Sequence, residues 1–88
     1  MLGISGWEQH ILDLGPNEEL IFEAESKRYH YWVVLEGWAH ATVESLSIDL
    51  EPGQVISIMP YSESRLKNLR STKLRVLVTS MEILKKKV

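Results

Sequence analysis

The residues that could do chemistry gather in one short stretch, where Glu25, Arg28 and His30 follow one another closely. An imidazole with an ordinary pKa of about 6.5 can accept a proton at neutral pH, and a neighbouring carboxylate would orient it and raise that pKa. A guanidinium can hold a phosphate through two parallel hydrogen bonds. These three residue types predict that His30 is a general base assisted by Glu25, and that Arg28 beside it binds an anion. The simpler alternative is a charge-assisted hydrogen bond between Glu25 and His30 without catalysis.

The elements that must position these groups are short strands. Apolar and polar residues alternate along most of the chain, and the segments 15–17 and 51–53 combine glycine, proline and asparagine or glutamate as turns do. The central strand is predicted over 28–36, ending at Gly37. The other predicted strands are 8–14, 20–25, 38–44, 46–50, 54–59, 64–69 and 72–83. Short strands at this spacing, with no helical apolar period, predict an all-β single domain, either a sandwich or a barrel.

Several residues in and around the central strand fit the pattern of a known family. In order they are Gly15-Pro16, Leu20 to Glu25, Arg28 to Val34, Gly37, Leu50 to Gly53, Pro60 and Asn68. The pattern resembles a cupin, and in particular the C-terminal cupin module of type II mannose-6-phosphate isomerase/mannose-1-phosphate guanylyltransferase proteins. The resemblance covers most of the chain, from residue 12 to residue 83. It implies a small jelly-roll barrel, or double-stranded β-helix, with a ligand site inside.

The departures from the family pattern fall on the positions that carry its chemistry. Where the family has a glutamine and a histidine, this chain has Glu23 and Glu25. The family's glutamate is replaced by His30, the histidine of its second motif by Ser64, and a turn glycine by Tyr61. The resemblance therefore implies a barrel framework that lacks the usual set of metal ligands.

The positions that match the family imply a ligand site inside the barrel. The predicted ligand-binding residues are Glu23, Arg28, Trp32, Tyr61, Ser64 and Asn68, and the candidate catalytic residues are His30 and Glu25. A divalent metal such as Zn²⁺ or Mn²⁺ accepts both carboxylate and imidazole, so an alternative is a partial metal site of Glu23, Glu25 and His30. Because the hydroxyl of Ser64 is a weak ligand, we expect no cofactor.

Composition narrows the classes of function. The chain has 88 residues, a net charge of −2 and no cysteine, which excludes disulfides and thiolate metal sites. The basic residues from Arg65 onward lack interleaved aromatics, so no nucleic-acid surface is predicted. There is no signal-peptide pattern and no apolar run near the ~18 residues of a membrane span, so a cytoplasmic protein is expected. Strand 72–83 is apolar on both faces, which favours a homodimer.

The function predicted from the sequence is non-catalytic binding of a small polar ligand, such as a sugar or sugar phosphate, in the barrel. One alternative is a mannose-6-phosphate isomerase-like sugar isomerase or epimerase that uses His30 with Glu25 or a metal. A further alternative is a structural or assembly protein that acts through its apolar outer faces.

Overall fold

The computed structural model describes the backbone of residues 2–22 and 28–85 and the side chains of residues 8–22 and 28–81. The regular elements in this part of the chain are all strands, which confirms the all-β prediction. They are β1 (Leu2–Leu14), β2 (Glu19–Phe22), β3 (Tyr29–Glu36), β4 (Ala39–Val43), β5 (Leu46–Leu50), β6 (Val55–Ile58), β7 (Ser64–Lys67) and β8 (Leu74–Lys85).

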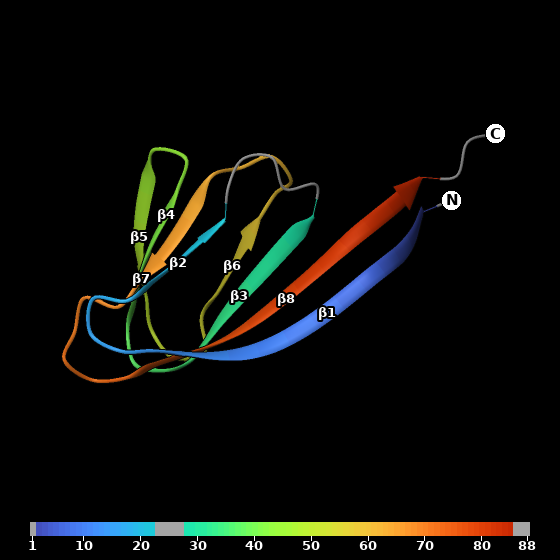
Figure 1. Ribbon diagram of the computed structural model, residues 1–88. Helices are drawn as coiled ribbons and strands as arrows, with labels where there is room; N and C mark the ends of the chain where they lie inside the picture. Colours follow the sequence, from blue (N-terminus) through green and yellow to red (C-terminus); the bar gives the residue numbers. More distant parts are fainter. Residues whose placement is uncertain (1, 23–27, 86–88) are drawn as a thin grey trace.

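The strands form two antiparallel sheets of four strands that face each other (Figure 1). We call the sheet with the order β1-β8-β3-β6 the first sheet, and the one with the order β2-β7-β4-β5 the second sheet. Side chains alternate between the faces of a strand, so His30, Trp32 and Val34 are buried between the sheets while their neighbours in β3 face outward. The buried apolar core contains Trp32, Val34, Ala39, Ala41, Leu50, Ile58, Leu66, Leu74, Val76 and Val78.

Two strands extend further than the sequence predicted. β1 begins at Leu2, six residues before the predicted strand, and β8 runs on to Lys85. Residues 2–5 pair with residues 82–85, whereas the pairing of β8 with β3 reaches only to Met81. The two strand ends form a ribbon that leads away from the barrel (Figure 1), and we call it the arm. Each strand of the arm supplies the backbone hydrogen bonds that the other needs, which is why both continue.

Candidate ligand-binding pocket

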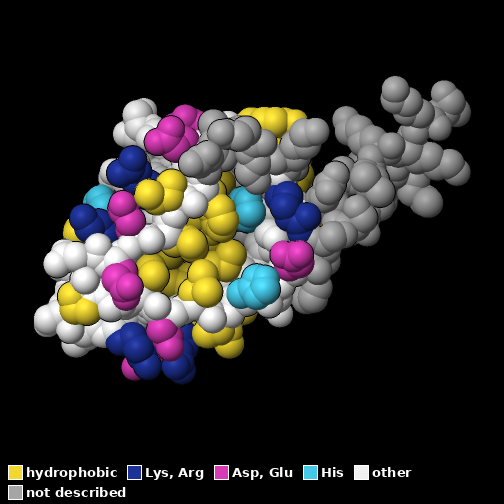
Figure 2. All heavy atoms as spheres, viewed as in Figure 1, with side chains coloured by type: hydrophobic (Ala, Val, Ile, Leu, Met, Phe, Trp, Pro, Cys, Tyr) yellow, Lys and Arg dark blue, Asp and Glu magenta, His cyan; other side chains and the backbone are white. Residues whose placement is uncertain are grey.

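A cavity of about 310 Å³ lies between the two sheets. Its apolar wall consists of Leu12, Leu20, Phe22 and Val78, and its polar lining consists of Glu8, His10, Arg28, His30 and Ser80. Most of these residues alternate along β1, β2 and β8, because every second side chain of a strand points to the same face. Figure 2 shows hydrophobic side chains gathered in this hollow, with histidine, basic and acidic side chains beside it. The cavity therefore combines an apolar interior with a polar margin.

His30 is held at the cavity wall by an aromatic stack. Its side chain is only 5% exposed, and its ring lies parallel to that of Phe22, with 3.9 Å between the centroids and 10° between the planes. Phe22 also packs against Trp32 at a centroid distance of 5.4 Å. Burial lowers the pKa of His30, and the positive charge of Arg28 lowers it further. The imidazole is therefore neutral at pH 7.

The sequence predicted a different electrostatic environment for His30. The expectation was a raised pKa, caused by the carboxylate of Glu25, but Glu23 and Glu25 lie outside the described residues. Among the described groups, burial and Arg28 both act in the opposite direction and favour the neutral ring. A neutral imidazole with a lowered pKa is a weaker base than the sequence suggested.

Arg28 is fixed beside His30 by the neighbouring strand β8. Its Nε donates a hydrogen bond of 3.2 Å to Oγ of Ser80, and its Nη2 donates one of 3.4 Å to the Ser80 carbonyl oxygen. Ser80 is itself buried. These contacts position the guanidinium along the cavity lining, where a planar donor group can meet the polar end of a ligand.

Of the predicted site residues that the structure describes, only Arg28 and His30 line the cavity. Trp32 and Ser64 are completely or almost completely buried in the core, and the indole Nε1 and the hydroxyl Oγ meet no hydrogen-bond partner among the described residues. Tyr61 is 60% exposed and has a positive φ of 63° in the loop before β7. It occupies the left-handed conformation that its position as a turn residue requires.

Asn68 connects two loops through buried hydrogen bonds and does not line the cavity. Its Nδ2 donates hydrogen bonds to the carbonyl oxygens of Leu14, at 3.0 Å, and Thr72, at 2.8 Å. Its Oδ1 accepts one from the backbone N–H of Arg70 at 3.0 Å. The Asn68 backbone also pairs with Asn17 and Glu18. This single buried amide ties the loop after β1 to the loop before β8.

The described residues do not form a metal site. No group of three or more histidine, aspartate or glutamate side chains converges in the part of the chain whose side chains are described. His10 and Glu8, at 3.7 Å, are both more than 60% exposed at the margin of the cavity. Because four ligands are usual for zinc, Glu8 and His10 do not make a zinc centre by themselves. The metal set predicted from the sequence, Glu23, Glu25 and His30, falls mostly outside the described residues.

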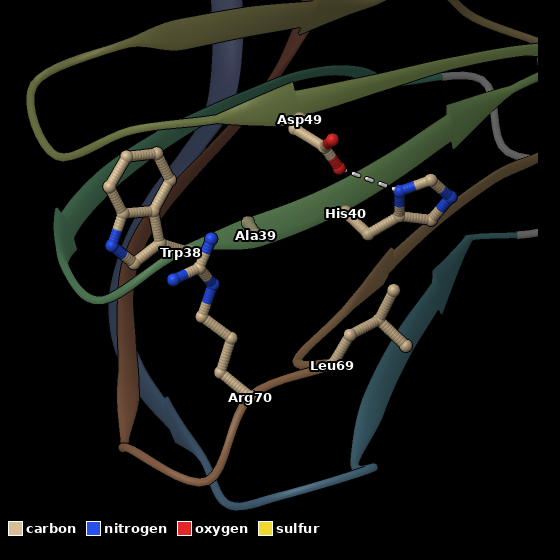
Figure 3. Close-up of a pocket in the computed structure, with 6 residues that line it drawn as sticks. All are labelled: Trp38, Ala39, His40, Asp49, Leu69 and Arg70. Carbon is tan, nitrogen blue, oxygen red and sulfur yellow. Dashed lines mark hydrogen bonds and ion pairs between the residues drawn. The ribbon is translucent and has the colours of Figure 1, made fainter.

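A second, smaller hollow of about 230 Å³ was not predicted from the sequence. It is lined by Trp38, Ala39, His40, Asp49, Leu69 and Arg70 (Figure 3). The Arg70 guanidinium stacks 4.5 Å from the Trp38 ring centroid, and Nδ1 of His40 lies 2.8 Å from Oδ1 of Asp49. His40 and Asp49 are directly paired across the β4–β5 hairpin. Their equal distances from the 44–45 turn were the signal in the sequence that could have revealed this pair.

No protein-family model matches the chain, and no curated protein sequence matches it either. Solved structures do match. The Schizosaccharomyces pombe Cnp3 cupin domain has a TM-score of 0.79 and 13% identity, covering 86% of this chain and 52% of that one. A Cupin 2 conserved barrel domain protein from Salinispora arenicola has a TM-score of 0.77 and 16% identity, covering 86% and 63%. A predicted oxalate decarboxylase from Thermotoga maritima has a TM-score of 0.77 and 13% identity, covering 84% and 64%.

These similarities define the class of the protein by its fold, which is that of a cupin barrel. The predicted resemblance to cupins is thus confirmed at the level of architecture, while the narrower resemblance to the mannose-6-phosphate isomerase module stays a prediction. The chain spans roughly half to two thirds of the length of these matched structures. No helix in the described part of the chain is long and apolar enough to cross a membrane.

Proposed function

We propose that the protein is a non-catalytic binding module whose barrel cavity takes one small molecule with an apolar body and an anionic group. The observation that carries this proposal is the division of the cavity lining. Leu12, Leu20, Phe22 and Val78 offer an apolar wall, and the Arg28 guanidinium is held beside them by Ser80. An apolar pocket with a few fixed polar groups is the usual form of a small-ligand site.

The size of the cavity limits the ligand. Sites for small molecules usually measure about 300–1,000 Å³, so a cavity of about 310 Å³ is at the small end of that range. A sugar phosphate, the ligand class suggested by the sequence, would bring several hydroxyl groups against the apolar wall. Each hydroxyl without a partner there would cost free energy. We therefore favour an aromatic or branched aliphatic carboxylate over a sugar phosphate.

Binding without catalysis is favoured by the state of His30. Its ring is buried, stacked on Phe22 and biased toward the neutral form by a lowered pKa. The described titratable side chains of Glu8 and His10 are exposed at the cavity margin. A sugar isomerase needs a base and an electrophile close to one substrate carbonyl, and the described lining offers no such convergent set.

Calorimetric titration with four matched compounds tests the proposal. Phenylacetate carries an apolar body and a charge, benzyl alcohol only the body, inorganic phosphate only the charge, and mannose 6-phosphate the sugar. We expect phenylacetate to bind more tightly than the other three. The variant Leu20→Trp fills the cavity and should abolish this binding, whereas Ile21→Trp, on the opposite, 45% exposed face of β2, should retain it.

Three results would overturn the proposal. The first is equal binding of phenylacetate by Leu20→Trp and Ile21→Trp, which would place the ligand elsewhere. The second is no binding of phenylacetate by the wild-type protein. The third is conversion of mannose 6-phosphate to fructose 6-phosphate, with or without added Zn²⁺ or Mn²⁺, which would establish the isomerase alternative instead.

A further inference from the structure

The second hollow lies on the outer face of the second sheet (Figure 3). Trp38 and His40 point to the same side of the chain at β4, because alternate residues of a strand share a face. Ala39 between them is only 2% exposed and belongs to the core, so the two larger side chains point outward. The residues that line this hollow and those that line the cavity between the sheets are two separate sets. The hollow is therefore a distinct surface feature.

One side of the hollow is formed by Arg70 stacked on Trp38. The guanidinium lies 4.5 Å from the centroid of the Trp38 ring, within the range of a cation–π contact. The backbone N–H of Arg70 donates a hydrogen bond of 3.0 Å to Oδ1 of the buried Asn68. Both ends of the Arg70 side chain are thus held in place. Stacking uses the flat face of the guanidinium, so the N–H groups along its edge can donate two parallel hydrogen bonds to a carboxylate.

The other side of the hollow holds a carboxylate, that of Asp49, which His40 orients. Nδ1 of His40 lies 2.8 Å from Oδ1 of Asp49, and because a carboxylate only accepts hydrogen bonds, the imidazole is the donor. This contact leaves acceptor capacity on the second oxygen, Oδ2. The Asp49 side chain is 79% exposed, so a ligand can reach it. Figure 3 shows Asp49 and Arg70 on either side of Ala39.

We propose that the second hollow binds a zwitterionic α-amino acid with an apolar side chain. The carboxylate of the ligand binds the Arg70 guanidinium, and its ammonium group binds Asp49. A simple anion is attracted by Arg70 but repelled by Asp49, and a simple cation experiences the reverse, whereas a zwitterion is attracted by both. Lys67, which pairs with His40, and Glu51, two residues after Asp49, are also opposite in sign and keep this balance.

The spacing of the strands agrees with a ligand of this length. Asp49 is directly opposite His40 on the neighbouring strand, and Trp38 is two residues from His40 along the chain. With a rise of about 3.4 Å per residue and about 4.8 Å between strands, the Trp38 and Asp49 backbones are about 8 Å apart. An α-amino acid measures about 2.5 Å from its nitrogen to its carboxylate carbon, and hydrogen bonds of about 2.9 Å at each end extend its reach to about 8 Å.

The apolar surface and the size of the hollow define the rest of the ligand. Leu69 is 58% exposed and Trp38 is 37% exposed, so both offer apolar surface to the side chain of the ligand. The volume of about 230 Å³ is below the about 300–1,000 Å³ of sites for drug-sized molecules. The ligand is therefore a single amino acid of about the size of leucine rather than a longer peptide.

A titration followed by two-dimensional ¹H–¹⁵N NMR tests the site, because each N–H group reports on its own position. Three matched probes are leucine, 4-methylpentanoate, which lacks the ammonium group, and 3-methylbutylamine, which lacks the carboxylate. We expect leucine to shift the signals of the Leu69 and Arg70 amides and of the Trp38 indole until they saturate. Leucine should bind at least about tenfold more tightly than either analogue, because each analogue lacks one charge-assisted hydrogen bond.

Two variants should change the preference among the three probes. Arg70→Gln removes the partner of the carboxylate, so it should raise the dissociation constant of leucine at least about tenfold without weakening 3-methylbutylamine. Asp49→Asn removes the partner of the ammonium group, so it should weaken leucine to a similar extent but strengthen 4-methylpentanoate, which is no longer repelled. The matched control is Arg65→Gln, which removes a positive charge at an exposed position of β7 outside the lining. It should bind leucine like the wild type.

Four results would overturn the proposal. The first is no response of the Leu69, Arg70 and Trp38 signals to leucine, and the second is equal dissociation constants for leucine and 4-methylpentanoate. The third is an Arg65→Gln variant that loses as much leucine binding as Arg70→Gln. The fourth is a set of leucine shifts confined to the cavity residues Leu12, Leu20 and Val78. The comparison of probes needs no variant, and each of these results leaves the phenylacetate test of the cavity as a separate experiment.

Discussion

At the scale of single residues, His30 shows how the barrel changes a side chain that the sequence marked as reactive. The sequence placed an imidazole close to carboxylates, which suggested a charged or hydrogen-bonded base. In the fold the ring is buried, parallel to Phe22 and near the guanidinium of Arg28. Each of these contacts favours the neutral ring, the stack through removal from water and Arg28 through repulsion between like charges.

The lowered pKa of His30 predicts a pH dependence of stability. The unfolded chain has an ordinary pKa of about 6.5, so as the pH falls below that value the unfolded state takes up a proton before the folded state does. The contribution of His30 to the free energy of unfolding is therefore fully present above about pH 6.5. It is lost as the pH falls toward the pKa of His30 in the folded state, by up to about 1.4 kcal/mol for each pH unit between the unfolded-state and folded-state pKa values.

Urea unfolding at about pH 7.5 and about pH 5 measures this loss. His30→Phe keeps an aromatic ring beside Phe22 but cannot be protonated, so it should lose less stability than the wild type between the two values. The contribution of Asp13, whose pKa is lowered by its hydrogen bonds with Arg75, is confined to more acidic solutions. Equal losses in the wild type and His30→Phe would refute the assignment.

At the scale of elements, the turn between β3 and β4 decides how the central strand leaves the first sheet. Gly37 has a φ of +85°, which side chains rarely allow. Its α-carbon also lies so close to β8 that a Cβ would overlap the carbonyl oxygen of Lys73 and press on the α-carbon of Leu74. The turn therefore requires glycine for two separate reasons, conformation and space.

Gly53 provides a control that separates these reasons. Its φ is +89°, close to that of Gly37, but a Cβ there would meet no atom within 4 Å. Gly53→Ala should therefore cost about 1 kcal/mol, from conformation alone. Gly37→Ala should cost at least about 2 kcal/mol more, because the backbone of β8 must move. Thermal unfolding of both variants measures the difference, and equal costs would show that the contact with β8 yields easily.

The sequence was a good guide to the elements because strand periodicity is local. Alternation of apolar and polar side chains and the turn residues at 15–17 and 51–53 require no knowledge of distant contacts. Each predicted strand overlaps one observed strand, and residues 23–25 of the predicted strand 20–25 lie outside the described residues. The arm was missed because its pairing joins opposite ends of the chain.

The site was harder to predict than the fold. Family spacing selected Arg28 and His30, which line the cavity, but it did not select Phe22 or Val78, which belong to the apolar wall of the cavity. Such residues look like ordinary core positions in a sequence. Asn68 was chosen as a ligand-binding residue, and the structure gives its amide three hydrogen bonds to loop backbone. Spacing alone does not distinguish these roles.

At the scale of the whole molecule, stability rests on a thin core between two short sheets. A domain of 88 residues buries a modest fraction of its surface, and its unfolding free energy should be about 4–13 kcal/mol. Much of the apolar surface remains outside, as the exposed residues Ile11, Ile48 and Val55 show. Each fully buried side chain therefore contributes a large share of the free energy of unfolding.

Leu66 and Leu46 test this distribution because they are the same residue in two extreme environments. Leu66 is 0% exposed in β7, between β2 and β4, whereas Leu46 is 77% exposed at the start of β5. Leu66→Ala should lower the unfolding free energy by about 2–5 kcal/mol, through lost burial and the cavity it leaves. Leu46→Ala should change it by less than about 0.5 kcal/mol. Urea unfolding of dilute protein measures both, and a large loss for Leu46→Ala would mean that β5 is covered in solution by another surface.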